Sequence, residues 1–95
     1  MLQYKAGYKF VDGGVHAQVL DFAAAISCGA DLDEARRMLG LALVDVAETF
    51  IGLGKALPKP DPSVSDPEMD LEEPIFLHLV ASSEVSQAPA GVVVP

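Results

Sequence analysis

Apolar and polar residues alternate over residues 2–11, which predicts a half-buried β-strand. The residues of the apolar face are Leu2, Tyr4, Ala6, Tyr8 and Phe10. Asp12-Gly13-Gly14 follows, and Asp-Gly between apolar runs is a strong hairpin signal because glycine adopts a positive φ without steric cost. Residues 15–22 alternate again and predict the return strand, with Val15, Ala17 and Val19 on one face.

A third short strand is predicted over residues 23–29, although alanine is a poor strand former. The helix predicted next runs from about Leu32 to Leu53. Asp31 is a suitable N-cap, and Glu34 completes a capping-box pattern three residues later. Gly54 is a suitable residue for ending the helix.

The predicted helix carries two apolar rows. At 100° per residue the main row faces the sheet and comprises Leu32, Ala35, Leu39, Ala42, Leu43, Val46, Phe50 and Leu53. A second row on the other side comprises Leu41, Val44 and Ile51. A surface helix needs no second row, so we expect it to be covered by a second subunit, a partner or the chain's own tail.

Residues 55–74 are predicted to form a proline-rich, acidic linker, because proline ends helices and stiffens extended segments. Such a run of acids usually solvates a loop, and it alternatively suits a basic partner. Residues 75–81 are apolar on both faces and predict a fourth strand buried on both faces. Residues 82–95 are predicted to form a tail that is disordered or pairs weakly.

These elements predict an α+β fold of order β-β-β-α-β, as a single domain over residues 1–81. The first three strands form an antiparallel meander. A right-handed crossover through the helix then places the fourth strand beside the first and parallel to it. The helix covers one sheet face and leaves the other open.

Composition narrows the choice of partner. The 95-residue chain is 51% hydrophobic with net charge −8, which argues against binding to nucleic-acid backbones and anionic membranes. The acidity either suits a basic protein partner or only keeps a small, apolar protein soluble. Cys28, the only cysteine, is predicted to be buried, and a single cysteine fits the reducing cytoplasm. The N-terminus resembles no signal peptide, and no apolar run reaches the roughly 18 residues of a membrane span.

The sequence holds little catalytic chemistry. His16 and His78 lie within apolar strands, and no Cys or carboxylate stands at metal-ligand spacing from them. The serines lack a nucleophile-elbow context, and no phosphate-binding glycine loop is present. Asp45 and Glu48 are one helical turn apart, but a solvated helix face accounts for them. We therefore predict no catalytic residue, no cofactor and no metal, so that a nuclease is only a distant third hypothesis.

Residues 4–60 resemble the HicB-type antitoxin family. The resemblance is carried by DGGVHAQVLDF (12–22), ISCGADLDEAR (26–36) and GKALPKP (54–60). The family pattern runs D-G-G, an alternating strand, P-D-L-P-G-C, a short strand ending in glycine, T-L-E-E-A, a helix and G-K-x-x-P-x-P. The sequence departs from it at Leu20, Ala23, Ala24 and Ala25, so the turn there is expected to differ in shape.

The resemblance implies a degraded ribonuclease-H-like fold and a binding role. HicB-type antitoxins occlude a small, basic, RNA-cleaving HicA-type toxin, and many carry a C-terminal DNA-binding domain. The residues after Ala81 are too few for such a domain, so a short form without direct nucleic-acid binding is expected. The candidate toxin-contact residues are Asp33, Glu34, Asp66, Glu68, Asp70, Glu72 and Glu73.

The alternative hypothesis is a solitary oligomeric domain with a structural or small-ligand-binding role and no toxin. The surplus apolar faces motivate it, and they predict a homodimer or a larger homo-oligomer. The candidate self-association residues are Leu41, Val44, Ile51, Phe76, His78 and Val80.

Overall fold

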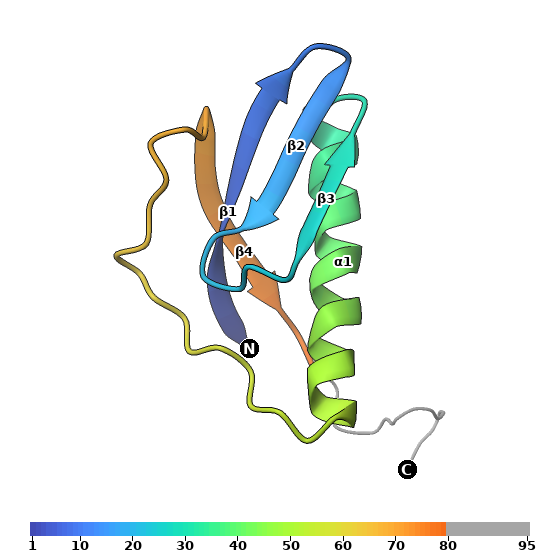
Figure 1. The fold of residues 1–95 in the computed structure, drawn as a ribbon, viewed down its shortest axis with the longest axis vertical. Coiled ribbons are helices and arrows are strands. Elements are labelled where there is room, and N and C mark those ends of the chain that lie inside the picture. The colour runs from blue at the N-terminus through green and yellow to red at the C-terminus, as the bar shows by residue number, and fades with distance from the viewer. Residues whose placement is uncertain (80–95) are drawn as a thin grey trace.

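A four-stranded antiparallel sheet with one long helix across it makes up the fold (Figure 1). The computed structural model describes residues 1–79. The elements are β1 (Leu2–Val11), β2 (Gly14–Val19), β3 (Ile26–Gly29), α1 (Leu32–Gly52) and β4 (Leu71–Leu77). The strand order is β3-β2-β1-β4. The predicted α+β class, element order and meander are thus confirmed. Val80 and the predicted tail lie outside the described residues.

The first hairpin forms as its alternation predicts. Val11 pairs with Gly14 across the turn. Gly13 has φ +83°, the left-handed conformation for which glycine is favoured in such hairpin turns. Tyr4, Ala6 and Tyr8 are buried on the face toward α1. Phe10 continues that face but is half exposed because it lies near the hairpin tip, beyond the helix.

A compact turn replaces the predicted junction between the second and third strands. β2 ends at Val19 and β3 begins only at Ile26, so the expected strand residues 20–25 are not in strands. Backbone hydrogen bonds close the turn, from Val19 N–H to Ala25 O and from Ala25 N–H to Phe22 O. The turn lets Phe22 enter the core, where its ring meets Tyr4 at 5.4 Å and Phe50 at 5.1 Å between centroids.

The ends of α1 follow the predicted capping chemistry. Asp31 Oδ1 accepts a hydrogen bond from Glu34 N–H, and Glu34 Oε1 accepts one from Ala30 N–H. Gly54 has φ +72° just beyond the helix, as expected for a terminating glycine. The fully buried helix positions are Ala35, Leu39, Leu43 and Ala47. Leu53, predicted on the buried row, is 69% exposed because the helix end extends past the sheet.

The last strand runs in the direction opposite to the one predicted. β4 pairs antiparallel with β1, with Tyr8 opposite Leu71 and Leu2 opposite Leu77. The predicted parallel arrangement would require the fourth strand to begin at the same edge of the sheet where the helix ends. Instead, the observed linker, which comprises residues 53–70, runs back along the length of the sheet. An extended segment of this length can span up to ~60 Å, which is enough for this return. The strand therefore begins beside the end of β1 (Figure 1).

The fourth strand also differs from its predicted bounds and burial. It covers Leu71–Leu77 instead of 75–81, and it includes Pro74, which an edge strand tolerates when its nitrogen faces away from the neighbour. Phe76 is 50% exposed, so the prediction of burial on both faces is wrong. One face of β4 packs toward the core through Leu77, and the other remains accessible at Phe76.

Candidate functional site: the acidic linker over the sheet

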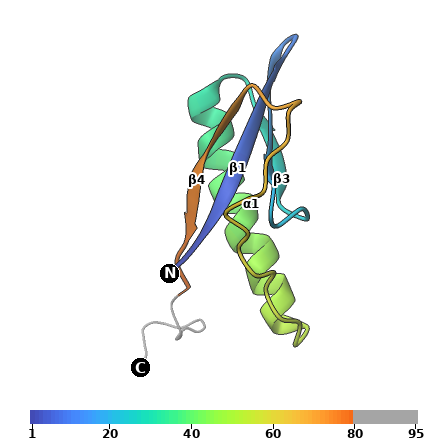
Figure 2. The ribbon, with the colours of Figure 1, turned by 90° about the vertical axis from the view of Figure 1, so that its left-hand side faces the viewer.

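The sheet face predicted to be open is partly covered by the linker. Lys5, Gly7 and Lys9 point to the face opposite Tyr4 and Tyr8, and the linker contacts all three. In Figure 2 the upper part of the linker and the N-terminal half of α1 lie on opposite sides of β1. The molecule thus has three layers there: helix, sheet and linker.

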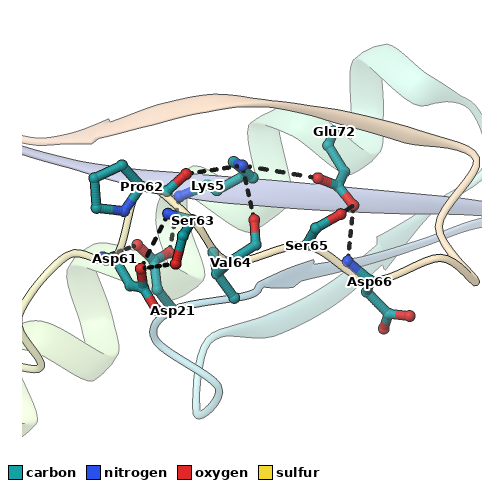
Figure 3. Close-up of polar contacts among 9 residues, drawn as sticks. All are labelled: Lys5, Asp21, Asp61, Pro62, Ser63, Val64, Ser65, Asp66 and Glu72. Atoms are coloured by element: carbon teal, nitrogen blue, oxygen red, sulfur yellow. Dashed lines mark hydrogen bonds and ion pairs between the residues drawn. The ribbon is translucent and has the colours of Figure 1, made fainter.

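Lys5 holds the middle of the linker (Figure 3). Its Nζ donates hydrogen bonds to Val64 O at 2.7 Å and to Pro62 O at 3.4 Å, and lies 3.9 Å from Glu72 Oε1. One ammonium group on β1 therefore joins the linker to β4. Lys5 therefore has a structural role. The alternating sequence pattern predicted only that this position is polar.

Asp21 joins three separate segments of the chain. From the turn after β2, its Oδ1 accepts a hydrogen bond from Lys5 N–H at 2.8 Å, and its Oδ2 accepts one from Asp61 N–H at 3.0 Å (Figure 3). The Lys5 carbonyl in turn accepts from Leu20 N–H. Beyond the end of β2, the Asp21 carboxylate therefore provides the hydrogen-bond acceptor for a β1 amide, and it also binds the linker backbone.

The far end of the linker is held by the hairpin strand. Asp70 N–H donates to Tyr8 O at 2.8 Å, and Asp70 Oδ2 accepts from Phe10 N–H at 2.7 Å. Lys9 Nζ donates to Glu68 O at 3.1 Å. At Gly7, an added Cβ would lie 2.8 Å from Met69 Cγ, so the absence of a side chain there lets the methionine pack onto the sheet.

Two linker-face carboxyl groups have lowered pKa values because they accept hydrogen bonds. The Asp66 backbone N–H, 2.9 Å from Glu72 Oε2, is the main cause of the lowered pKa of Glu72, with Ser65 and Lys5 contributing. Hydrogen bonds from the Ser63 hydroxyl and N–H lower the pKa of Asp61. Both groups favour their charged form in the folded protein.

Acid should therefore loosen the linker. A folded-state pKa below the unfolded one means that the stabilisation is present above about pH 4.5 and is lost as pH falls through the folded pKa values of Glu72 and Asp61. We expect hydrogen exchange, extrapolated to a common intrinsic rate, to show linker amides losing protection before α1 amides as pH is lowered from about 6 to 3. Simultaneous loss of protection in both segments would contradict this order.

A bidentate ion pair connects the helix to β4 on the core side. Arg36 Nε and Nη2 donate to the two carboxylate oxygens of Glu73, both at 2.9 Å. The neighbouring Tyr8 is buried, which raises its pKa to about 12, with the charge of Glu73 adding to the effect. Glu73 is therefore part of the internal packing of the domain, and its charge is largely compensated.

A groove formed around Lys5, Asp21 and Asp61 carries side chains of both charges. It measures about 550 Å³ and is lined by Gln3, Tyr4, Lys5, Asp21, Asp61, Pro62, Glu72, Glu73 and Pro74. Most of the charged groups in this lining already bond to one another or to backbone.

Across residues 1–79, no three His, Cys, Asp or Glu side chains converge as a metal site would require. Over the same residues, no helix is long and apolar enough to cross a bilayer.

The predicted toxin-contact acids do not form one uniform surface. Glu34, Asp70, Glu72 and Glu73 each accept an internal hydrogen bond, and Asp66 Oδ1 accepts one from Glu68 N–H. Among the described residues, Glu68 is exposed and its carboxylate makes no hydrogen bond or ion pair. Asp33 is 94% exposed and lies 3.5 Å from Arg36. Their role in toxin contact stays a prediction.

The predicted self-association residues lie on different elements. Leu41, Val44 and Ile51 are exposed on the outer side of α1, whereas Phe76 is exposed on β4 and His78 follows it. Val80 lies outside the described residues.

Cys28, predicted to be buried, is exposed because it pairs with His16 and therefore points to the sheet face away from the helix. The sequence analysis did not identify Lys5 and Asp21 as residues that anchor the linker. The one sequence signal for either residue was that Asp21 lies in the stretch that matches the family pattern.

The fold and this site define a small α+β domain whose polar groups fasten its own segments together. Two solved structures from Burkholderia pseudomallei share the fold. One is the N-terminal domain of the antitoxin HicB, with TM-score 0.69 and 22% identity over 82% of this chain and 100% of that one. The other is the antitoxin HicB, with TM-score 0.73 and 22% identity over 100% of this chain and 75% of that one.

The chain therefore has a HicB-like fold, and the resemblance drawn from residues 4–60 is confirmed at the level of structure. No protein-family model matches the chain, and no curated protein sequence matches it.

Proposed function

We propose that this protein is a non-catalytic, antitoxin-like binding domain that occludes a small basic protein, as a HicB-type antitoxin does with a HicA-type toxin. The observation that carries the proposal is the likeness of the whole chain to a protein described as the antitoxin HicB. The net charge of −8 supports a basic partner, because an acidic surface accelerates encounter with positive charge.

The anchored linker supports this proposal physically. Its acids are attached to a segment that Lys5, Lys9 and Asp21 hold against the sheet. A partner that docks there orders little additional chain, so less conformational entropy is lost on binding. Of the predicted contact acids, Glu68 on the linker is exposed and makes no internal ion pair among the described residues, and Asp33 in the first turn of α1 is 94% exposed.

Co-expression with a candidate toxin, a short basic protein, tests the proposal. We expect restored growth, intact cellular RNA and co-purification of the two proteins. Neutralising both accessible acids in Asp33→Asn/Glu68→Gln should slow association several-fold at low salt, with little change at high salt. The matched control is Asp12→Asn/Asp45→Asn, which removes two exposed charges at the hairpin tip and on the outer side of α1. Toxicity that persists, together with no co-purification, would refute the proposal.

A solitary oligomeric domain is the second candidate. The observation in its favour is the exposure of Leu41 at 60%, Ile51 at 52% and Phe76 at 50%. A homo-oligomer observed together with no binding to the candidate basic toxin would favour this candidate over the antitoxin-like role.

A further inference from the structure

The outer side of α1 carries a regular stripe that faces no described part of the chain. Its positions are spaced alternately by three and four residues, which is the repeat of helices that pair along their length. The stripe consists of Glu34, Arg37, Leu41, Val44, Glu48 and Ile51. Its apolar members are 39% to 60% exposed, although α1 is otherwise packed against the sheet. Arg37 and Glu48 are exposed too.

The order of the four central residues in the stripe is symmetric, whereas Glu34 and Ile51 at its ends fall opposite each other without matching in character. Leu41 and Val44 are equally far from the midpoint between Ala42 and Leu43, and so are Arg37 and Glu48. When two copies of α1 pair antiparallel about that midpoint, Leu41 of each meets Val44 of the other. Arg37 of each then meets Glu48 of the other. The centre is apolar, and both flanks hold opposite charges.

We propose that a second copy of this chain docks here, forming an isologous dimer through an antiparallel pair of α1 helices. A two-fold interface must be complementary to itself, and the four central positions of the stripe meet that condition: Leu41 meets Val44, and Arg37 meets Glu48. Binding of a different protein would not require such symmetry. The 21-residue helix is about 31 Å long, so contacts can extend over several turns.

The charges also select the arrangement. Parallel pairing would place Arg37 against Arg37 and Glu48 against Glu48. Antiparallel pairing shifted by one heptad would bring Leu41 against Ile51, but it would place Val44 against Glu48 and Arg37 beyond the end of the partner helix. Like charges in contact disfavour the parallel arrangement, and the shifted one loses both Arg37–Glu48 pairs. The proposal is independent of the antitoxin-like role, because it concerns α1 and not the linker.

A charge exchange on the full-length protein tests the arrangement, with sedimentation velocity as the readout. Wild type should be dimeric at micromolar concentrations. Arg37→Glu alone and Glu48→Arg alone should each raise the dimer Kd about tenfold, because two attractive contacts become repulsive. The double variant R37E/E48R, and a mixture of the two single variants, should restore dimers. The matched controls are Lys59→Glu and Glu68→Arg, which change the net charge equally on the linker and should leave the Kd unchanged.

A second variant tests the apolar centre. Leu41→Lys should abolish the dimer while leaving the circular dichroism spectrum and unfolding of the monomer intact, since this side chain is 60% exposed. A wild-type monomer at up to about 100 µM would overturn the proposal and leave the stripe to another protein or to the rest of this chain. A dimer whose Kd responds to none of the α1 variants would overturn it as well.

Discussion

Gly29→Ala is expected to cost about 2–4 kcal/mol of the free energy of unfolding, the largest loss for a single added methyl group in this protein. Gly29 ends β3 where the start of α1 crosses it. An added Cβ would collide with the backbone nitrogen of Ala35 and lie 2.8 Å from the carbonyl carbon of Glu34. These are backbone atoms, so rotation of a side chain cannot relieve the contact. The whole first turn of the helix would have to move away from the sheet.

Urea denaturation measures this effect, with Gly40→Ala as the matched control. Gly40 lies inside α1, and an added Cβ there meets nothing within 4 Å. This control should gain about 0.5–1 kcal/mol, because alanine loses less conformational entropy than glycine in a helix. Both variants should be compared with wild type at one protein concentration. Equal stability of the two variants would show that the close approach at Gly29 has no energetic weight.

Asp21→Ala is expected to cost about 1–3 kcal/mol and to release the middle of the linker. The substitution removes the acceptor for two backbone N–H groups, those of Lys5 and Asp61. A partly buried donor left without a partner costs more than the hydrogen bond itself contributes. Asp45→Ala, on the exposed side of α1, changes the net charge equally and should alter stability by less than about 0.5 kcal/mol.

Local measurements separate this effect from general destabilisation. In Asp21→Ala, amide exchange should accelerate at Lys5 and Asp61 more than in β3, and a protease should cleave the linker sooner. Asp21→Asn keeps one oxygen acceptor and should be intermediate in stability. Uniform acceleration across the whole domain would argue against a specific anchoring role for Asp21.

Local patterns predicted those elements that depend mainly on neighbouring residues. The alternation over residues 2–11, the Asp12-Gly13 turn and the caps at Asp31 and Gly54 all agree with the structure. Strand ends were less predictable. Ala23 and Ala24 continue an apolar run and were assigned to a strand, but the chain turns there to place Phe22 in the core.

The candidate site was only partly visible in the sequence. Its acids were evident from the composition of residues 55–74, but their partners were not. Glu73 belongs with Arg36, which lies 37 positions away, and Asp21 belongs with Asp61, 40 positions away. No local pattern encodes such pairs, because they form only when β4 pairs with β1 and the linker lies over the second face of the sheet.

The sequence by itself determined the type and order of the elements, the first hairpin turn and the helix caps, since these depend on side-chain periodicity, φ preferences and capping over a few residues. Only the tertiary structure decided the direction of β4 and the covering of the second sheet face. The physical reason is the linker: prolines keep it extended, but its path depends on distant groups such as Lys5 and Asp21 that bind its backbone.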